Sequence, residues 1–297
     1  MKKKSSIIKC PVCEKELFKI EQHRLFRCEK NHTFDLAKEG YINLLLIQDM
    51  KSKNPGDSKE MVDSRQKFLA KGFYRKISSK INETIADLLK AQSDQSLNLL
   101  DMGCGEGYYF DRLIKHLKLK SANYYGLDIS KSAIKTASKQ NDKALWMVGN
   151  SFFTPFKDHS LDCILSVFSP IDMKECKRLL KEDGVLVRVF PETNHLMQLK
   201  EVIYPEIKVK EYEQYLSDFT ALEVCSVSEV SYDIELSNED LGRLLLMTPH
   251  FWRVKEENKE KLLEMESIVV TISVTVGVYR PKKTKEKVKA KSNGGKK

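Results

Sequence analysis

The chain has 297 residues, 41% of them hydrophobic, which is enough for one domain of ordinary size and a small accessory module. Its net charge of +9 belongs to its ends: residues 280–297 hold nine Lys/Arg and one Glu, MKKK adds three Lys, and the residues between sum to −2. The composition excludes a strongly basic folded surface, and no apolar stretch is long enough to span a bilayer.

The two ends of the chain suggest a cytoplasmic protein with a free tail. No apolar segment follows MKKKSS, so we expect no signal peptide. Seven unevenly spaced Cys favour reduced thiols or metal ligands over disulfides. Residues 281–297 have nothing apolar to bury and predict a disordered basic tail, either a solubilising extension or a phosphate-binding arm.

Residues 1–50 contain the pattern of a metal-binding module. The pattern C-x2-C-x14-C-x3-H is made by Cys10, Cys13, Cys28 and His32. Such a ligand set suits a tetrahedral structural Zn²⁺ with no open position for chemistry. ELFKI and HRLFRC between the two pairs alternate apolar and polar residues and predict a short hairpin. The alternatives are incidental cysteines or a redox CxxC, which would need a βαβ context that is not found here.

Residues 51–96 predict two linker helices. Asp57 or Ser58 suits the N-cap of the first and Gly72 its end, and FYRKISSKINETIADLLKA predicts the second. Basic side chains in the first segment are expected to share contacts with phosphate groups, with a solvated helix face as the alternative. These side chains are Lys51, Lys53, Arg65, Lys67, Lys71 and Arg75.

Residues 97–280 are predicted to form a second, larger domain, which has a glycine-rich turn near its beginning. In NLLDMGCGEGYYFDRLIKHLK, an apolar strand ends in Asp101, glycines follow at every second position, and a helical pattern comes next. The glycines are Gly103, Gly105 and Gly107. Glycines let the backbone approach a nucleotide closely. The dinucleotide pattern GxGxxG fails because Tyr108 and Phe110 occupy its last position, and no Walker loop is present.

The segments that follow alternate as in an α/β fold with a mostly parallel sheet. ANYYGLDIS predicts a strand that ends in Asp128, an acid placed to accept both hydroxyls of a ribose. KSAIKTASKQ predicts a helix, and KALWMVGNS and LDCILSVFSP predict strands. MKECKRLLKEDG predicts a helix closed by Gly184, followed by the strand VLVRVF. ALEVCSVSEVSYDIEL and SIVVTISVTVGVY would complete the sheet as an antiparallel pair.

The turn D-x-G-x-G-x-G and the elements after it resemble the class I S-adenosylmethionine-dependent methyltransferases, which have a Rossmann-like fold. This turn and three further stretches occur in one order: CPVC…C…H.FD.AKEGY.NLL, PGDS.EM…R..FL..G.Y, LD.GCGEGYY and HL..LK..IY. Together they resemble the bacterial 23S ribosomal RNA guanine-N1 methyltransferases that carry an N-terminal zinc module. The resemblance covers residues 8 to 280.

This resemblance implies transfer of a methyl group from S-adenosylmethionine to N1 of a guanine in a hairpin loop of 23S ribosomal RNA. It also implies that the three Cys and the His hold zinc. For the cofactor it implies Tyr74, Asp101, Gly103, Gly105, Glu106, Gly107, Asp128 and His195. From the residues alone, Tyr74 is equally well explained as a core aromatic at a helix start, and His195 as a loop residue near a helix N-terminus.

The chemistry needs a group that handles a proton, since guanine N1 is protonated at neutral pH. In this fold the catalytic region follows the fourth strand, here SVFSP and IDMKE. Ser169 and Pro170 are placed to form the rim of a base pocket, and Asp172 is the nearest carboxylate and our candidate for deprotonating N1. The alternative role of Asp172 is the N-cap of the next helix.

The N1 edge is hidden in a duplex, so the target guanine is expected to be unstacked or flipped, with the zinc module gripping the RNA. Phe251 and Trp252 would either stack on a flipped base or complete a helix–sheet core. A homodimer is compatible with a zinc module of one subunit that helps to hold RNA. Two other functions remain: a small-molecule methyltransferase of the same fold, and a non-catalytic adaptor that binds zinc and RNA.

Overall fold

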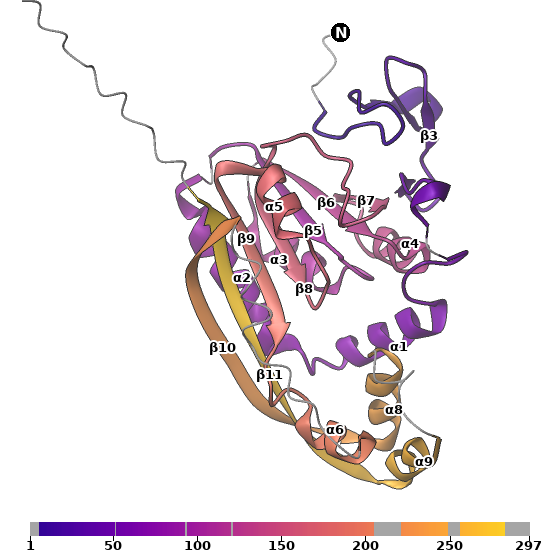
Figure 1. The fold of residues 1–297 in the computed structure, drawn as a ribbon, viewed down its shortest axis with the longest axis vertical. Helices are drawn as coiled ribbons and strands as arrows, with labels where there is room; N and C mark the ends of the chain where they lie inside the picture. The colour runs from indigo at the N-terminus through magenta and orange to yellow at the C-terminus, as the bar shows by residue number, and fades with distance from the viewer. Residues whose placement is uncertain are drawn as a thin grey trace, which may run out of the picture.

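The fold combines a small metal-binding sheet with one large sheet and its covering helices (Figure 1). The computed structural model describes residues 6–50, 52–92, 94–119, 121–204, 221–248 and 256–282. Lys51, the Phe251–Trp252 pair and residues 283–297 of the basic tail lie outside these ranges. Among the helices within them, none has the length and apolar character needed to cross a membrane.

The N-terminal module is a three-stranded antiparallel sheet. β1 (Phe18–Ile20) and β2 (Leu25–Arg27) form the predicted hairpin, and β3 (Thr33–Asp35), which was not predicted, pairs with β2. Leu17 and Phe26 are buried and belong to the apolar cluster that continues under the large sheet, so this core is small within the module itself. The candidate zinc ligands lie before β1 and after β2, where a metal ion adds the stability that this core lacks.

Both predicted linker helices are present. α1 (Lys59–Ala70) begins at Ser58, whose hydroxyl accepts a hydrogen bond from the backbone N–H of Met61 at 3.3 Å. Gly72, with φ of +85°, separates α1 from α2 (Arg75–Leu89). α2 repeats buried apolar residues every fourth position, which gives it one continuous face toward the core. These residues are Ile77, Ile81, Ile85 and Leu89.

The large sheet has eight strands in the order β10-β11-β9-β8-β5-β6-β7-β4. Its parallel centre consists of β5 (Leu97–Met102), β6 (Ala122–Asp128), β7 (Ala144–Val148), β8 (Leu161–Val167) and β9 (Leu180–Pro191). The connecting helices are α3 (Tyr108–Leu117), α4 (Lys131–Gln140) and α5 (Met173–Leu179). The five strands and the helices between them follow the predicted alternation, so the α/β fold with a mostly parallel sheet is confirmed.

Apolar clusters cover both faces of this sheet. Leu99 of β5 belongs to a cluster that includes Ile81 of α2 and Phe110 of α3. The next residue, Leu100, points to the opposite face and joins a second cluster, which contains Phe26 of the metal module and Met173 of α5. The metal module therefore packs against the same face of the sheet as α5.

The N-terminal segment also contributes an edge strand. β4 (Ile42–Asn43) pairs in parallel with β7, and the N–H of Leu44 donates to the carbonyl of Val148 at 2.9 Å. This strand was not predicted from the sequence. It makes residues 42–44 part of the sheet that carries the glycine turn, although they precede that turn by about sixty positions.

The other edge of the sheet is the predicted antiparallel pair. β10 (Leu222–Ser237) and β11 (Ser267–Pro281) are long and curved, and β11 pairs with β9. The far end of this pair carries three helices, α6 (Met197–Ile203), α8 (Asn238–Leu246) and α9 (Glu256–Glu264). The second of them, α8, lies next to α1 (Figure 1).

The prediction that Gly184 closes the helix after the fourth strand is wrong. α5 ends at Leu179, and Leu180 is already extended and pairs with Leu161 of β8. Leu180 is fully buried, so apolar burial in the sheet outweighs continuation of the helix. Gly184 instead lies where β9 shifts its register against β8, and a Cβ there would be 2.9 Å from the carbonyl oxygen of Leu161.

Candidate functional site

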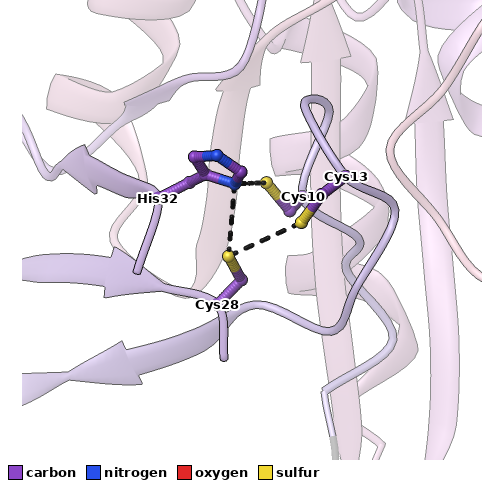
Figure 2. A group of neighbouring side chains, drawn as sticks. All are labelled: Cys10, Cys13, Cys28 and His32. Atoms are coloured by element: carbon purple, nitrogen blue, oxygen red, sulfur yellow. Dashed lines mark hydrogen bonds between the residues drawn. The ribbon is translucent and has the colours of Figure 1, made fainter. Parts of the chain in front are cut away.

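The four predicted metal ligands converge from two loops (Figure 2). The sulfur atoms of Cys13 and Cys28 are 3.7 Å apart, and the Nδ1 atom of His32 lies 3.6 Å from the sulfur of Cys10 and 3.5 Å from that of Cys28. Tetrahedral Zn²⁺, with its usual bond lengths, sets S···S near about 3.8 Å and S···N near about 3.6 Å. The four ligand atoms therefore fit a tetrahedral zinc ion and would occupy all four of its coordination positions.

Each ligand pair sits on a tight turn of the backbone. In the first, the N–H of Glu14 donates to the carbonyl of Cys10, and Glu14 has a φ of +58°. In the second, Asn31 donates to the carbonyl of Cys28 and has a φ of +63°. The left-handed residue lies directly after Cys13 in the first turn and between Cys28 and His32 in the second, so the chain reverses its direction sharply at each ligand pair.

The metal module is tied to the large domain by backbone hydrogen bonds. The N–H of Lys9 donates to the carbonyl of Pro155 at 2.7 Å, and that of Lys157 donates to Ile7 at 2.8 Å. The ammonium of Lys157 also forms an ion pair with Glu16 at 2.7 Å. These bonds attach the module to the segment that follows β7.

At two of its three glycines, the turn after β5 approaches its neighbours too closely for a side chain. Gly103 has a φ of +76°, and a Cβ on it would lie 1.9 Å from the hydroxyl oxygen of Ser169. Gly107, at the start of α3, has a φ of +85°, and a Cβ on it would lie 2.7 Å from the ring of Trp146. The turn therefore brings bare backbone next to the loop after β8, as a nucleotide cradle requires.

Asp128 holds this turn in place from the end of β6. Its carboxylate accepts hydrogen bonds from the N–H of Gly105 at 2.9 Å and from that of Ser130 at 2.8 Å. The predicted acid therefore stands at the carboxyl end of its strand and directly beside the glycine turn. Ser130 in turn donates its hydroxyl proton to the carbonyl of Asp57 at 2.7 Å, which links the site to the linker segment.

Three acids lie around the turn: Asp101 and Glu106 are buried, and Asp128 is partly buried. Asp101 and Glu106 are 2% and 3% exposed, and burial raises the pKa of Asp101 well above its usual value. Burial also raises the pKa of Asp128, and that of Glu106 to about 7. The Oε2 atom of Glu106 has no hydrogen-bond partner among the described residues. Such a site is suited to a ligand that carries positive charge and hydrogen-bond donors.

Arg65 balances part of this negative charge. Its guanidinium lies 2.5 Å from the carboxylate of Asp57 and 3.8 Å from that of Glu106, and it donates to the carbonyl of Met247 at 3.2 Å. The sequence placed Arg65 among the phosphate contacts, whereas the structure turns it inward to the glycine turn. Lys71 is likewise engaged, in an ion pair with Asp240 at 2.6 Å.

Other members of the basic cluster face outward. Lys53, Lys67 and Arg75 are exposed and retain the predicted capacity to contact phosphate groups. The basic residues of this segment therefore divide into two groups: some form ion pairs within the protein, and others are exposed to solvent. Successive side chains of a helix point in different directions, so neighbours in the sequence can have different surroundings.

Tyr74 and His195 meet in one aromatic group with Phe168. The ring centroids of Tyr74 and His195 are 6.4 Å apart, and Phe168 lies 5.9 Å from the first and 5.8 Å from the second. The Nδ1 atom of His195 accepts from the N–H of Ser273 at 3.2 Å. Sequence reasoning did not select Phe168, which directly precedes the Ser169 that contacts the glycine turn and has a φ of +55°.

Asp172 has the alternative role that the sequence suggested. Its carboxylate accepts a hydrogen bond from the N–H of Lys174 at 2.8 Å and caps the N-terminus of α5. No contact in the structure tests its proposed action on guanine, which stays a prediction.

We expect the substitution Glu106→Gln to raise the free energy of unfolding by about 3 kcal/mol above pH 7 and to have little effect below pH 4.5. The folded state keeps a proton on Glu106 up to a pKa of about 7, whereas the unfolded chain loses it near 4.5. Stability contributed by this group is therefore complete below pH 4.5 and falls as the pH rises toward 7. Urea unfolding of the cofactor-free protein across this range measures the difference.

The exposed substitution Glu83→Gln is the control, since it removes the same charge from the surface of α2. Equal pH dependence of Glu106→Gln and the unsubstituted protein would contradict the prediction.

Comparisons with known proteins match both parts of the site. Residues 8–53 match the family model described as RlmA, N-terminal, a zinc ribbon, and residues 100–188 match a methyltransferase domain. YxjB of Bacillus subtilis, provisionally named a 23S rRNA (guanine-N(1)-)-methyltransferase, is 30% identical over 91% of this chain and 96% of its own length. The 23S rRNA (guanine(748)-N(1))-methyltransferase of Streptomyces fradiae is 29% identical over 92% of this chain and 96% of its own.

A solved structure, the YcgJ protein of Bacillus subtilis, aligns with 67% of this chain and 98% of its own at 15% identity, with a TM-score of 0.45.

Proposed function

The chain belongs to the family of 23S rRNA (guanine-N1)-methyltransferases, and we propose from this premise that it methylates N1 of a guanine in a hairpin loop of 23S ribosomal RNA. One observation carries the proposal: a group of four metal-ligating side chains, Cys3His, and a glycine turn with three acids around it occur together in a chain that aligns with such a relative along nearly its whole length. The methyl donor is S-adenosylmethionine.

The residues around the glycine turn suit this donor. When bound, S-adenosylmethionine supplies a sulfonium methyl group that a nucleophile displaces in line. Asp128 would accept the ribose hydroxyls. The Oε2 atom of Glu106, which accepts no hydrogen bond from the described residues although Arg65 lies 3.8 Å away, offers an acceptor to the amino group. Together with the buried Asp101, these acids favour a cationic ligand. Tyr74 and His195 would complete the contacts beside them.

The target base would enter beside the loop after β8. Ser169 already contacts the glycine turn, so a base held at Ser169 and Pro170 lies next to the donor. A guanine bound here must lose its N1 proton before or during attack on the methyl group, which a carboxylate or a carbonyl near N1 would assist. Asp172 is the candidate carboxylate of this loop.

The substitution Asp172→Asn separates catalysis from capping. Asparagine caps a helix about as well as aspartate, so we expect unchanged thermal stability. If the carboxylate takes the N1 proton, the rate of methyl transfer falls by about 100-fold or more, while the affinity for S-adenosylmethionine is retained. Single-turnover assays with labelled donor measure the rate, and a full rate would assign Asp172 to the helix cap alone.

RNA binding is proposed for the metal module and the outward basic side chains. Lys53, Lys67 and Arg75 offer charge to phosphate groups, and the metal module lies on the same chain segment that leads into them. We propose a cytoplasmic enzyme, with a homodimer as the arrangement in which a second metal module would help to hold the RNA. Sedimentation of the full chain measures the oligomeric state.

Mass mapping of 23S ribosomal RNA from cells with and without the gene tests the function. We expect one guanine to lose its N1 methyl group in the deletion strain and to regain it when the gene is restored. An unchanged methylation pattern, combined with calorimetric binding of S-adenosylmethionine, would favour a small-molecule methyltransferase. Absence of cofactor binding would favour an adaptor that binds zinc and RNA.

A further inference from the structure

Two adjacent phenylalanines are exposed on the loop after β7. The side chains of Phe152 and Phe153 are 43% and 79% exposed, although large aromatic side chains usually lie in the core. One exposed apolar residue needs no explanation, but two neighbouring rings form a surface suited to a flat apolar partner. Neither residue has a role in the site described above.

The backbone beneath the two rings is fixed. The side-chain oxygen of Asn150 accepts from the N–H of Phe152 at 2.9 Å, and its carbonyl accepts from that of Phe153 at 3.3 Å. On the other side, the N–H and the hydroxyl of Thr154 both donate to Glu175 of α5, at 2.8 and 2.7 Å. The loop is therefore held at both ends and presents its rings to solvent in a defined position.

This loop connects the cofactor side of the site to the acceptor side. Before the rings, the N–H of Gly149 donates to the carbonyl of Asp128 at 3.0 Å. Next to them, the hydroxyl of Ser151 donates to the carbonyl of Pro170 at 3.3 Å, in the loop proposed to hold the target base. After them, the carbonyl of Pro155 accepts from Lys9 of the metal module. The loop that carries the rings therefore runs from the proposed base pocket to the metal module.

We propose that Phe152 and Phe153 form a stacking platform for unpaired bases of the ribosomal RNA loop that carries the target guanine. The inference rests on the proposed function, because it takes the RNA substrate from there. Bases in a loop have free faces, and stacking on aromatic rings is strong and tolerant of base identity. A fixed platform also loses little conformational entropy on binding.

The chemistry of the two rings favours bases over the other components of RNA. Phenylalanine has no donor, acceptor or charge, so it contributes nothing to phosphate contacts. The outward basic side chains Lys53, Lys67 and Arg75 provide those contacts instead. This division matches the way proteins grip RNA loops, with cations for the backbone and aromatic faces for the bases.

Four variants of the full, zinc-loaded chain test the proposal: Phe153→Ala, Phe153→Leu, Phe153→Trp and, as a control, Val227→Ala. Val227 is 50% exposed on β10, at the opposite edge of the sheet. The probe is 23S ribosomal RNA transcribed in vitro, with affinity measured by filter binding. We expect the Ala and Leu variants to bind about 10- to 100-fold more weakly, and the Trp and control variants to bind like the unsubstituted protein.

Leu keeps an apolar side chain of similar size but has no aromatic face, so equal binding by the Leu and Trp variants would overturn stacking. Unchanged RNA affinity of Phe153→Ala would overturn the platform altogether. A shift of Phe153→Ala to a different oligomeric state in sedimentation would instead assign the rings to contact between copies, and would also overturn it. Filter binding measures RNA affinity and requires no methyl transfer. A failure of the stacking proposal can therefore be distinguished from a failure of the proposed methylation.

Discussion

The variant Cys28→Ser is expected to lose its zinc ion and to unfold the metal module. Cys28 is buried and lies within 3.7 Å of the ligand atoms of both Cys13 and His32. The module contributes few buried apolar residues of its own, among them Leu17 and Phe26, to the core that it shares with the large domain. In small zinc domains the metal contributes about 10–16 kcal/mol to folding, which is more than these few residues provide. Metal analysis of the full chain measures its zinc content, and limited proteolysis measures whether cleavage occurs within residues 6–36.

The variant Cys225→Ser is the matched control, since Cys225 is exposed on β10 and is not a ligand. We expect it to retain zinc and resist proteolysis. In Cys28→Ser, binding of S-adenosylmethionine should largely survive while methylation of RNA is lost, because the glycine turn lies on a separate part of the sheet. Retention of stoichiometric zinc by Cys28→Ser would show that this residue is not a ligand.

The variant Gly103→Ala is expected to abolish cofactor binding and to lower the free energy of unfolding by about 3 kcal/mol or more. Two costs combine here. A φ of +76° disfavours any residue with a Cβ, and this Cβ would lie 1.9 Å from the hydroxyl oxygen and 2.4 Å from the Cβ of Ser169. Rotating the serine side chain removes only the first contact, so the loop after β8 must move. Calorimetry and denaturant unfolding measure the two effects.

Gly40→Ala separates these costs. Gly40 also has a positive φ, of +95°, but a Cβ there would meet nothing within 4 Å. We expect it to lose only the backbone contribution, about 1 kcal/mol, and to bind S-adenosylmethionine normally. If the two alanine variants were equally stable, close packing of Ser169 against the glycine turn would be refuted.

The local elements were predictable because each depends on short-range physics. Ser58 caps α1 through a hydroxyl aimed at a nearby N–H, and α4 begins and ends at the predicted residues. The strands of the parallel centre are apolar runs buried on both faces. The convergence of the three Cys and the His, and the place of Asp128 beside the glycine turn, were predictable because metal and ribose binding demand particular residue types at particular spacings.

The features that escaped prediction depend on distant partners. Gly184 has the local appearance of a helix C-cap, but pairing of Leu180 with Leu161 decides where the strand begins. The charge of Arg65 was evident, yet its direction is set by Asp57, Glu106 and Met247. Exposure of Phe153 was equally invisible, because phenylalanine most often marks a core.

The pairing of β4 with β7 has a consequence for any attempt to dissect the protein. A fragment beginning at residue 51 would retain every residue of the glycine turn but would lack β4. Strand β7, which contains the apolar Trp146 and Met147, would then be an unpaired edge strand. Unpaired edge strands pair with strands of other molecules and promote aggregation. The methyltransferase domain therefore cannot be expected to fold as a soluble fragment by itself. Insolubility of that fragment would result from the loss of β4 and would not show that the cofactor site is defective.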